Sequence, residues 1–256
     1  MLHTLSKKII ALSLCLLPLQ AFAESSSNST FKVGLEAAYY HYDETSFYTG
    51  SKLMRVQGPM FGVNADYFHD YGNKYFVTVD GRALVGVEKY DGSLQNGTPH
   101  HTGYATQSQL FEARVTPGYQ FENFDFYAGL GYRLKADAPK YANRHGYPRQ
   151  SHYLYIPVGI KIPTVLWGAQ AYPFIEYDLF LQGRQVTDLT RFGGSKFSNH
   201  QHDGFGVKTG IVFKLNKFDL VPYINYWNID HSDMNTIGYE PANTTWEIGI
   251  KINFLY

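Results

Sequence analysis

The chain ends with the stretch Trp246-Glu-Ile-Gly-Ile-Lys-Ile-Asn-Phe-Leu-Tyr256, in which apolar and polar residues alternate almost throughout. Successive side chains of a β-strand point to opposite faces, so this pattern predicts a strand with one apolar face and one polar face. The apolar face carries Trp246, Ile248, Ile250, Ile252, Phe254 and Tyr256, and the polar face carries Glu247, Gly249, Lys251 and Asn253.

The same alternation recurs along the chain and predicts about ten strands, with eight or twelve as alternatives. Each segment is about as long as the roughly 9–11 residues that a tilted strand needs to cross a bilayer. Pro117 and Pro157 lie inside two of the segments and lack a ladder donor, so we expect a bulge at each. The predicted strands are 31–42, 59–69, 75–88, 110–121, 124–134, 153–162, 171–183, 205–215, 220–229 and 244–256.

The predicted connections alternate between short and long. The short ones are 70–74, 122–123, 163–170 and 216–219, and the long ones are 43–58, 89–109, 135–152, 184–204 and 230–243. Membrane β-barrels join their strands in this way, with short periplasmic turns and longer external loops. The sequence therefore predicts an all-β fold, a closed antiparallel up-and-down transmembrane β-barrel with both chain ends on the periplasmic side.

Charged residues within the predicted strands all fall on the face opposite the apolar one. A Lys or Arg on the lipid side of a barrel costs about 2–4 kcal/mol at the bilayer midplane, which explains such a pattern. The charges are expected to face the lumen as a network, in which Asp80 and Arg82 on one strand can pair with Glu112 and Arg114 on the next. The predicted lumen residues are Glu36, Asp66, Asp80, Arg82, Glu112, Arg114, Arg133, Lys161, Glu176, Asp178, Lys208, Glu247 and Lys251.

The first residues have the features of an export signal. Lys7 and Lys8 precede an apolar run, residues 9–19, that is too short to span a bilayer, and Ala21-Phe-Ala23 provides small residues around a cleavage site. We therefore expect a cleaved signal peptide at 1–23, a flexible N-terminus at 24–30 and the barrel domain at 31–256. The single cysteine, Cys15, lies in the predicted signal, so no disulfide framework is expected.

Composition agrees with this picture and argues against nucleic acid as a partner. Basic and acidic residues number 22 each, whereas a nucleic-acid-binding surface calls for an excess of Lys and Arg. The chain also contains 22 Tyr, 18 Phe and 3 Trp, the residues that form girdles at both lipid–water interfaces of membrane barrels.

With these patterns, residues 31–256 resemble the small outer-membrane β-barrel proteins of Gram-negative bacteria, the broad OmpA/OmpX/Opa-like group. The resemblance implies a location in the cell outer membrane after removal of the signal peptide. It also implies contact with outer-membrane lipid and lipopolysaccharide, and recognition of the closing strand 246–256 by the barrel-assembly machinery. The group includes structural anchors, adhesins, narrow channels and a few enzymes, so membership leaves the activity open.

The favoured function is a non-enzymatic structural or surface-interaction role through the external loops. Segments 91–97 and 191–195 are rich in small and polar residues that suit exposed loops contacting an extracellular ligand. The first alternative is a narrow, porin-like channel for ions or small solutes, lined by the paired charges. A ten-stranded barrel is much narrower than the 16–18-stranded porins, which favours a filled lumen.

A hydrolase at the barrel rim is the second alternative. Asp230-His231-Ser232-Asp233 brings a base, a hydroxyl and two carboxylates together, and omptin-type outer-membrane proteases use an Asp/His pair facing an acidic pair. No matching Asp-x-Asp is found, and His231 and Ser232 are neighbours that a regular strand points to opposite faces. We predict no catalytic residue and no enzyme activity, whether of a protease or of a hydrolase that modifies lipid A or phospholipid.

Several histidines lie in the predicted external loops. His200-Gln-His202-Asp203 offers two imidazoles and a carboxylate, but its spacing matches no known metal motif. The loop histidines can also form a cluster that gains charge below about pH 6.5. We expect solvated side chains, with neither a metal nor a cofactor, at His100, His101, His145, His152, His200, His202 and His231.

Overall fold

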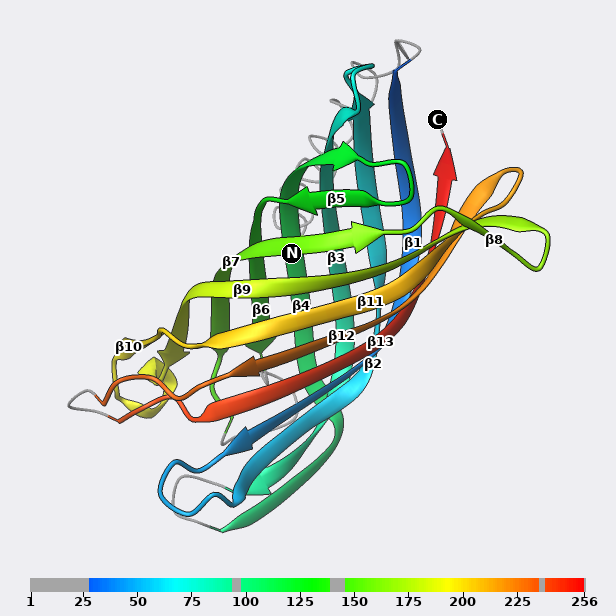
Figure 1. Ribbon diagram of the computed structural model, residues 1–256. Coiled ribbons are helices and arrows are strands. Elements are labelled where there is room, and N and C mark those ends of the chain that lie inside the picture. Colours follow the sequence, from blue (N-terminus) through cyan, green and yellow to red (C-terminus); the bar gives the residue numbers. More distant parts are fainter. Residues whose placement is uncertain (1–27, 94–97, 139–145, 235–237, 256) are drawn as a thin grey trace, which may run out of the picture.

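The computed structural model describes residues 28–93, 98–138, 146–234 and 238–255, which form one continuous closed sheet (Figure 1). The predicted signal peptide lies outside these residues, as do residues 24–27, whereas Ser29 and Thr30 already belong to the first strand. No helix in these ranges is long and apolar enough to cross a membrane. The strands are β1 (Ser29–Thr45), β2 (Lys52–Asp70), β3 (Tyr75–Ser93), β4 (Pro99–Gln120), β5 (Asp125–Ala128), β6 (Leu130–Ala138), β7 (Arg149–Lys161), β8 (Thr164–Leu166), β9 (Ala169–Asp188), β10 (Lys196–Gln201), β11 (Gly204–Lys214), β12 (Phe218–Ile229) and β13 (Ala242–Leu255), with a 3₁₀ helix, η2 (Thr190–Phe192), before β10.

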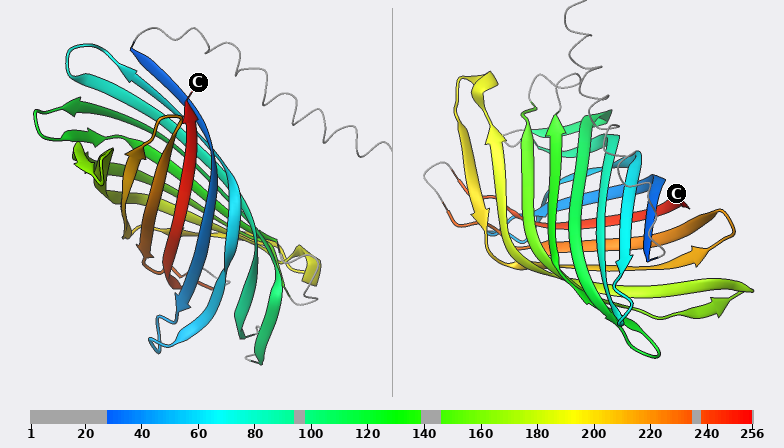
Figure 2. Two further views of the ribbon diagram at one scale, coloured as in Figure 1. Left: turned by 90° about the vertical axis from the view of Figure 1, so that its right-hand side faces the viewer. Right: turned by 90° about the horizontal axis from the view of Figure 1, so that it is seen from above.

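Ten antiparallel strand positions close the ring, because β5 and β6 together occupy one of them. The order is β1, β2, β3, β4, β5 with β6, β7, β9, β11, β12 and β13, while β8 and β10 pair with β9 outside the ring. Strand β13 closes the barrel between β12 and β1, and Figure 2 shows it beside β1. The predicted all-β barrel is confirmed, with ten strands rather than eight or twelve.

The two prolines interrupt the ladder without producing the predicted bulges. Pairing of β4 with β5 and β6 keeps one register past Pro117, and the register shift of β7 against β9 lies between Leu154 and Tyr155 rather than at Pro157. The break instead falls at Gly129, between β5 and β6, where the Gly129 amide donates to the Pro157 carbonyl at 3.0 Å. A missing N–H removes a ladder bond but inserts no residue, so the register is preserved.

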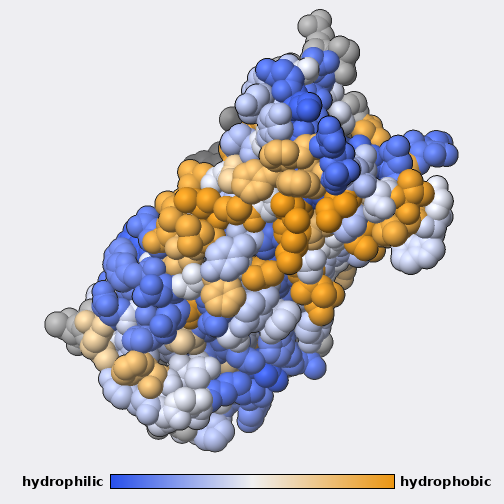
Figure 3. Space-filling model, in the orientation of Figure 1, coloured by the Kyte–Doolittle hydropathy of each residue, from blue (hydrophilic) through white to orange (hydrophobic). Residues whose placement is uncertain are grey.

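The outer face of the barrel is apolar across its middle. Figure 3 shows hydrophobic residues gathered in a broad central zone between two more hydrophilic ends. Aromatic rings pack at both ends of this zone, for example Tyr75 with Tyr119 at 5.0 Å and Tyr226 with Trp246 at 4.5 Å between ring centroids. The arrangement matches the apolar band and the two aromatic girdles of a membrane barrel. Exposed residues of the band include Leu35, Phe61, Val63, Val85, Phe111, Val115, Ile175, Leu179, Ile224 and Ile248.

On the external side the strands continue well past their predicted ends. Strand β2 begins at Lys52 and β4 at Pro99, so much of the predicted loops 43–58 and 89–109 is hairpin arm rather than loop. The predicted loop 184–204 likewise contains the end of β9, η2 and β10. Beyond the bilayer neither face needs to be apolar, so the alternation that marks a strand fades while backbone pairing continues. The boundaries predicted there were therefore wrong.

Inside the barrel, large aromatic rings lie directly opposite glycines on the neighbouring strands. A Cβ atom placed on each of these glycines would approach the facing ring to between 2.2 and 2.9 Å, closer than atoms can pack. The absence of a side chain thus makes room for a ring in a narrow lumen, an arrangement known to stabilise glycines in sheets. The pairs are Phe76 with Gly118, Tyr127 with Gly159, Tyr155 with Gly131, Phe174 with Gly210, and Tyr223 with Gly249.

Replacement of Gly249 by Ala is expected to destabilise the barrel by about 1–3 kcal/mol, the usual cost of overpacking. The new Cβ would lie 2.5 Å from the Tyr223 ring, which cannot move without leaving its buried hydrogen bonds. The measurement is the midpoint of urea unfolding of the protein refolded in lipid vesicles. Gly81→Ala is the matched control, because its nearest neighbour would be the Glu112 carbonyl oxygen at 3.6 Å. Equal midpoints for the two variants would contradict the packing explanation.

Candidate functional site

The centre of the lumen is organised by Arg82 on β3. Its guanidinium donates to Glu112 at 2.5 Å, to Glu36 at 2.8 Å and to Glu247, and also to the Tyr223 hydroxyl at 3.1 Å. Arg82 and its three carboxylate partners are all buried. Four charges removed from water need such mutual contacts, because an unpaired buried charge is very costly. We call Arg82, Glu36, Glu112, Glu247 and Tyr223 the Arg82 cluster.

A second group lies beside this cluster on the periplasmic side. Arg114 on β4 donates to Asp80 at 2.9 Å and to Glu176 at 2.6 Å, and so joins β3 to β9 across the lumen. Nearer the periplasmic end, Lys32 donates to Asp219 at 2.5 Å. The cross-strand pairing of Asp80 with Arg114 and of Arg82 with Glu112 follows directly from the β3–β4 register.

The other predicted lumen residues also face the interior but differ in their partners. Arg133 and Lys251 lie beside the Arg82 cluster, 3.6 Å from Glu247 and 3.7 Å from Glu36 respectively. Three others contact uncharged groups: Asp66 accepts from Asn253 at 2.8 Å, and Lys161 and Lys208 lie 5.3 and 5.9 Å from the ring centroids of Tyr127 and Tyr223. Asp178 is buried, and its Oδ1 has no hydrogen-bond partner in the described part of the chain.

Two ion-pair groups near the external end were missed by the sequence reasoning. Lys135 donates to Asp137 at 2.5 Å and to Glu88 at 3.0 Å. Arg149 bonds to both Glu44 and Glu240. Most of these residues lie beyond the predicted strand ends. The alternation of inward and outward positions could have identified them. Glu44 lies an even number of residues after Glu36, and Lys135 two residues after Arg133, so both fall on the inward face of their strands.

Strand β1 meets these groups one after another. Its inward residues are Lys32, bonded to Asp219; Glu36, in the Arg82 cluster; Tyr40, under the Lys135 ammonium at 4.4 Å; and Glu44, bonded to Arg149. At about 3.4 Å per residue the series covers about 40 Å of strand, or about 28 Å along the barrel axis for a tilt of about 45°, which is close to the thickness of a bilayer core. Charged contacts therefore fill the barrel interior from one end to the other.

Aromatic side chains close the space between the charged groups in the outer half. Trp227, Tyr155 and Ile229 are fully or almost fully buried and pack with Tyr153 and Phe180. The gap left between this layer and the Lys135 and Arg149 groups has a volume of about 10 Å³, about the space that one water molecule needs. At this level of the lumen the side chains therefore leave little free space.

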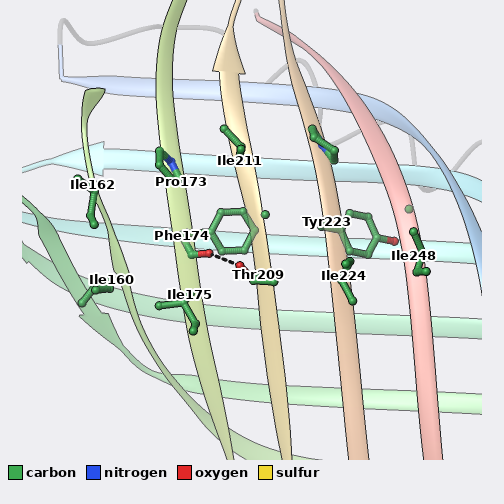
Figure 4. Close-up of a pocket in the computed structure, with 13 residues that line it drawn as sticks. Ile160, Ile162, Pro173, Phe174, Ile175, Thr209, Ile211, Tyr223, Ile224 and Ile248 are labelled. Carbon is green, nitrogen blue, oxygen red and sulfur yellow. Dashed lines mark hydrogen bonds between the residues drawn. The ribbon is translucent and has the colours of Figure 1, made fainter. Parts of the chain in front are cut away.

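A shallow hollow lies on the outside of the barrel wall. It is a groove of about 640 Å³ across β7, β9, β11, β12 and β13, and its apolar lining includes six isoleucines (Figure 4). Thr209 faces it, and its hydroxyl donates to the Phe174 carbonyl at 2.9 Å. A lipid-facing hydroxyl needs such an internal partner, since no water reaches it there. The groove belongs to the surface that acyl chains cover.

The predicted closing strand presents its apolar set to this same outer surface. Trp246, Ile248, Ile250 and Phe254 are exposed on the barrel wall, and Ile252 is partly buried. Tyr256 lies outside the described residues.

The external rim brings His231 close to an acid, and the hydroxyl of the neighbouring Ser232 bonds to backbone groups instead. Asp230 Oδ1 lies 2.7 Å from the His231 ring Nδ1, and the His231 ring packs against Phe47 at a tilt of 38°, with centroids 4.3 Å apart. Partial burial raises the pKa of Asp230, but the hydrogen bonds from His231 outweigh it and leave this pKa below its usual value. Ser232 is buried, and its hydroxyl bonds to the Asp233 carbonyl and the Glu240 amide.

The six loop histidines that the structure describes lie at separate places on the external end. In residues 28–93, 98–138, 146–234 and 238–255, no group of three or more His, Cys, Asp or Glu residues is placed to hold a metal ion. His101 and His202 contact single carboxylates, those of Asp91 and Asp233, and His152 bonds to the Tyr132 hydroxyl. His145 lies outside the described residues.

Comparisons with known proteins support the fold alone. No protein-family model matches the chain, and no curated protein sequence matches it. Among solved structures, the outer-membrane protease OmpT from Escherichia coli aligns over 90% of this chain and 96% of its own, with 8% identity and a TM-score of 0.52. The β-domain of the Bordetella autotransporter BrkA (88% and 99% covered, 10% identity, TM-score 0.49) and neisserial surface protein A (88% and 97%, 14%, 0.40) are more remote. The chain therefore has the fold of an outer-membrane β-barrel.

Replacement of Arg82 by Met is expected to destabilise the barrel by about 3–5 kcal/mol, because it leaves three buried carboxylates without their counter-ion. The free energy of unfolding in urea, measured in lipid vesicles, tests this. The control is Arg55→Met, which removes a partly exposed guanidinium from Asp43 and should cost about 1 kcal/mol or less. Similar losses for the two variants would show that the lumen network adds little stability.

The attachment of the external loop before β13 is expected to weaken as pH rises. Burial raises the pKa of Glu240 to about 8, although Arg149 opposes the shift, so the group is more stable protonated in the folded state. This stabilisation is complete below the ordinary glutamate pKa and is lost as pH passes through about 8. Hydrogen exchange of the Ser232 and Glu240 amides, corrected for intrinsic rates, should show falling protection between pH 6 and 9. In Glu240→Gln the protection should no longer depend on pH.

Proposed function

We propose that this chain is an integral outer-membrane protein of a Gram-negative bacterium, exported with a signal peptide at residues 1–23, that serves a structural or surface-interaction role through its external side. The role is non-enzymatic. The observation that carries the proposal is the unbroken series of buried charged and aromatic contacts along the lumen. A barrel filled in this way has only its outer wall and its two ends available for function.

The filled lumen disfavours the alternative of a channel. A conducting pore keeps its lining charges hydrated and accessible. Here the charge of Arg82 is paired with Glu36 and Glu247, and all three side chains are shielded from water. Residues of this kind hold strands of a barrel together, and they are poorly placed to attract ions from solution.

The rim geometry disfavours the alternative of a hydrolase. A serine nucleophile has to be within hydrogen-bond reach of its base. The Ser232 hydroxyl is committed to backbone groups, and His231 is held by Asp230 and by the Phe47 ring. The likeness to OmpT is one of fold and brings no catalytic residue to this chain.

The external end favours an interaction role. Strand pairs that continue past the apolar band raise their loops above the membrane, and Arg149 ties three of these segments together through Glu44 and Glu240. On this view the wall contacts outer-membrane lipid and lipopolysaccharide, strand β13 is the part offered to the barrel-assembly machinery, and the rim meets an extracellular ligand.

Single-channel recording in a planar bilayer tests the closed lumen. Mature protein refolded in detergent, and shown to be folded by a heat-dependent gel shift, is expected to give no conductance steps. Reproducible conductance steps would contradict the proposal. A change of ion selectivity in Arg114→Gln would then assign the conductance to the charges of the lumen. The control is Arg184→Gln, an arginine of β9 that pairs with β10 at the external end.

A further inference from the structure

Four aromatic side chains form a cluster at the external rim. Phe47 and Tyr48 come from the β1–β2 turn, and His231 and Tyr239 from the segment between β12 and β13. Their ring centroids lie 4.3 Å apart for Phe47 and His231, 5.5 Å for Phe47 and Tyr48, and 5.7 Å for Tyr48 and Tyr239. We call these four residues the rim aromatic cluster.

The cluster exposes apolar surface where the membrane cannot cover it. Phe47 is 58% and Tyr48 69% exposed. Trp246 of the outer aromatic girdle lies opposite His41 of β1, and β1 continues to Thr45, four residues further, before the turn that carries Phe47 and Tyr48. Those four residues span about 13 Å along the strand, or about 9 Å above the girdle for a strand tilted by about 45°. Contact with lipid therefore does not account for these rings, and exposed apolar patches of this kind mark interaction sites.

Buried polar groups hold the cluster in place from both sides. The Ser46 hydroxyl accepts from the amides of Tyr48 and Thr49 at 3.2 and 3.3 Å, which fixes the β1–β2 turn. On the other side the Ser232 amide donates to the Glu240 carbonyl at 2.9 Å, and Glu240 is bound to Arg149. Rings ordered before a ligand arrives lose little entropy on binding it, so the cluster is preorganised.

Two oxygen acceptors are joined to the rings. The Asp230 carboxylate, 56% exposed, is the charged group joined to the cluster, through His231, and the Tyr239 hydroxyl accepts from the Phe47 amide at 3.4 Å. Carboxylate and phenol oxygens can accept hydrogen bonds from hydroxyl groups, whereas Asp230 would repel an anion. A ligand with an apolar face and a hydroxylated edge fits this combination.

A saccharide ring is such a ligand, since its C–H groups present an apolar face and its hydroxyls point outward from the edge. We propose that the rim aromatic cluster binds a neutral oligosaccharide, with a sugar ring stacked on Tyr48 and Phe47 and its hydroxyls directed to Asp230. The inference rests on the proposed surface-interaction role and names the class of ligand. The Asp230 carboxylate disfavours a sulfated or phosphorylated sugar.

The test uses mature, refolded protein in detergent on an array of immobilised neutral and sulfated oligosaccharides, followed by titration of the best neutral binder. One arm carries dephosphorylated core oligosaccharides of lipopolysaccharide and the other carries neutral oligosaccharides of other origin, which separates a membrane source from an external one. Binding of neutral sugars is expected in either arm, with affinity about tenfold weaker in Tyr48→Ala.

Tyr71→Ala is the matched control, because Tyr71 is also an exposed tyrosine but lies at the periplasmic turn after β2, and it should bind as the unchanged protein does. Binding restricted to sulfated sugars, no binding at all, or equal affinity in Tyr48→Ala would each overturn the inference. Bilayer recording separates this from the proposed function: a silent barrel that binds no sugar overturns the inference alone, whereas a conducting barrel overturns the closed-lumen role.

Discussion

The rest of this structure depends on the pairing of charges inside a closed wall. A lumen only ten strands around cannot hydrate Arg82, Glu36, Glu112 and Glu247 separately, so they are stable only in mutual contact. Because the partners come from strands β1, β3, β4 and β13, satisfying them fixes how distant segments meet across the interior. The network thus favours one strand register over others, since a slip of any one of these strands by one residue would carry its charge to the lipid side and leave the partners unpaired.

The different surroundings of the two faces of the wall reinforce that strand register. Lipid on the outside excludes charge, while the narrow interior limits volume, and the chain meets the second limit by setting glycines opposite rings. Gly249 makes room for Tyr223, whose hydroxyl lies 2.5 Å from Glu36 and 2.8 Å from Glu247. Packing and electrostatics are therefore not separate contributions here, because the ring that fills the space also supplies a partner for two carboxylates.

The fold was predictable from sequence because three patterns have the same cause, the bilayer around the barrel. They are the alternation of apolar and polar residues, the alternation of short and long loops, and the exclusion of charge from the lipid-facing side. Every predicted strand is present, and the predicted lumen residues face inward. Their partners were less predictable: Asp80 with Arg114 follows from simple adjacency, whereas Arg114 with Glu176 depends on how the ring closes. Arg149 and Glu240 were missed because they lie above the membrane, where alternation no longer marks strands. The ladder break at Gly129 was also missed, because it depends on which residue of β7 faces this position: the Gly129 amide donates to the carbonyl of Pro157 there.

The same change of solvent explains why the external end is the place to look for function. Within the bilayer each side chain is constrained by lipid on one face and by a packed interior on the other, which leaves little freedom for a ligand. Above the bilayer both constraints lapse, yet this end is not loosely built: Arg149 joins β1, β7 and the segment before β13, and Ser46 fixes the first turn. A rigid base that holds exposed Phe47 and Tyr48 in water keeps apolar surface uncovered at a cost in free energy. That cost has a physical reason if a ligand covers the rings.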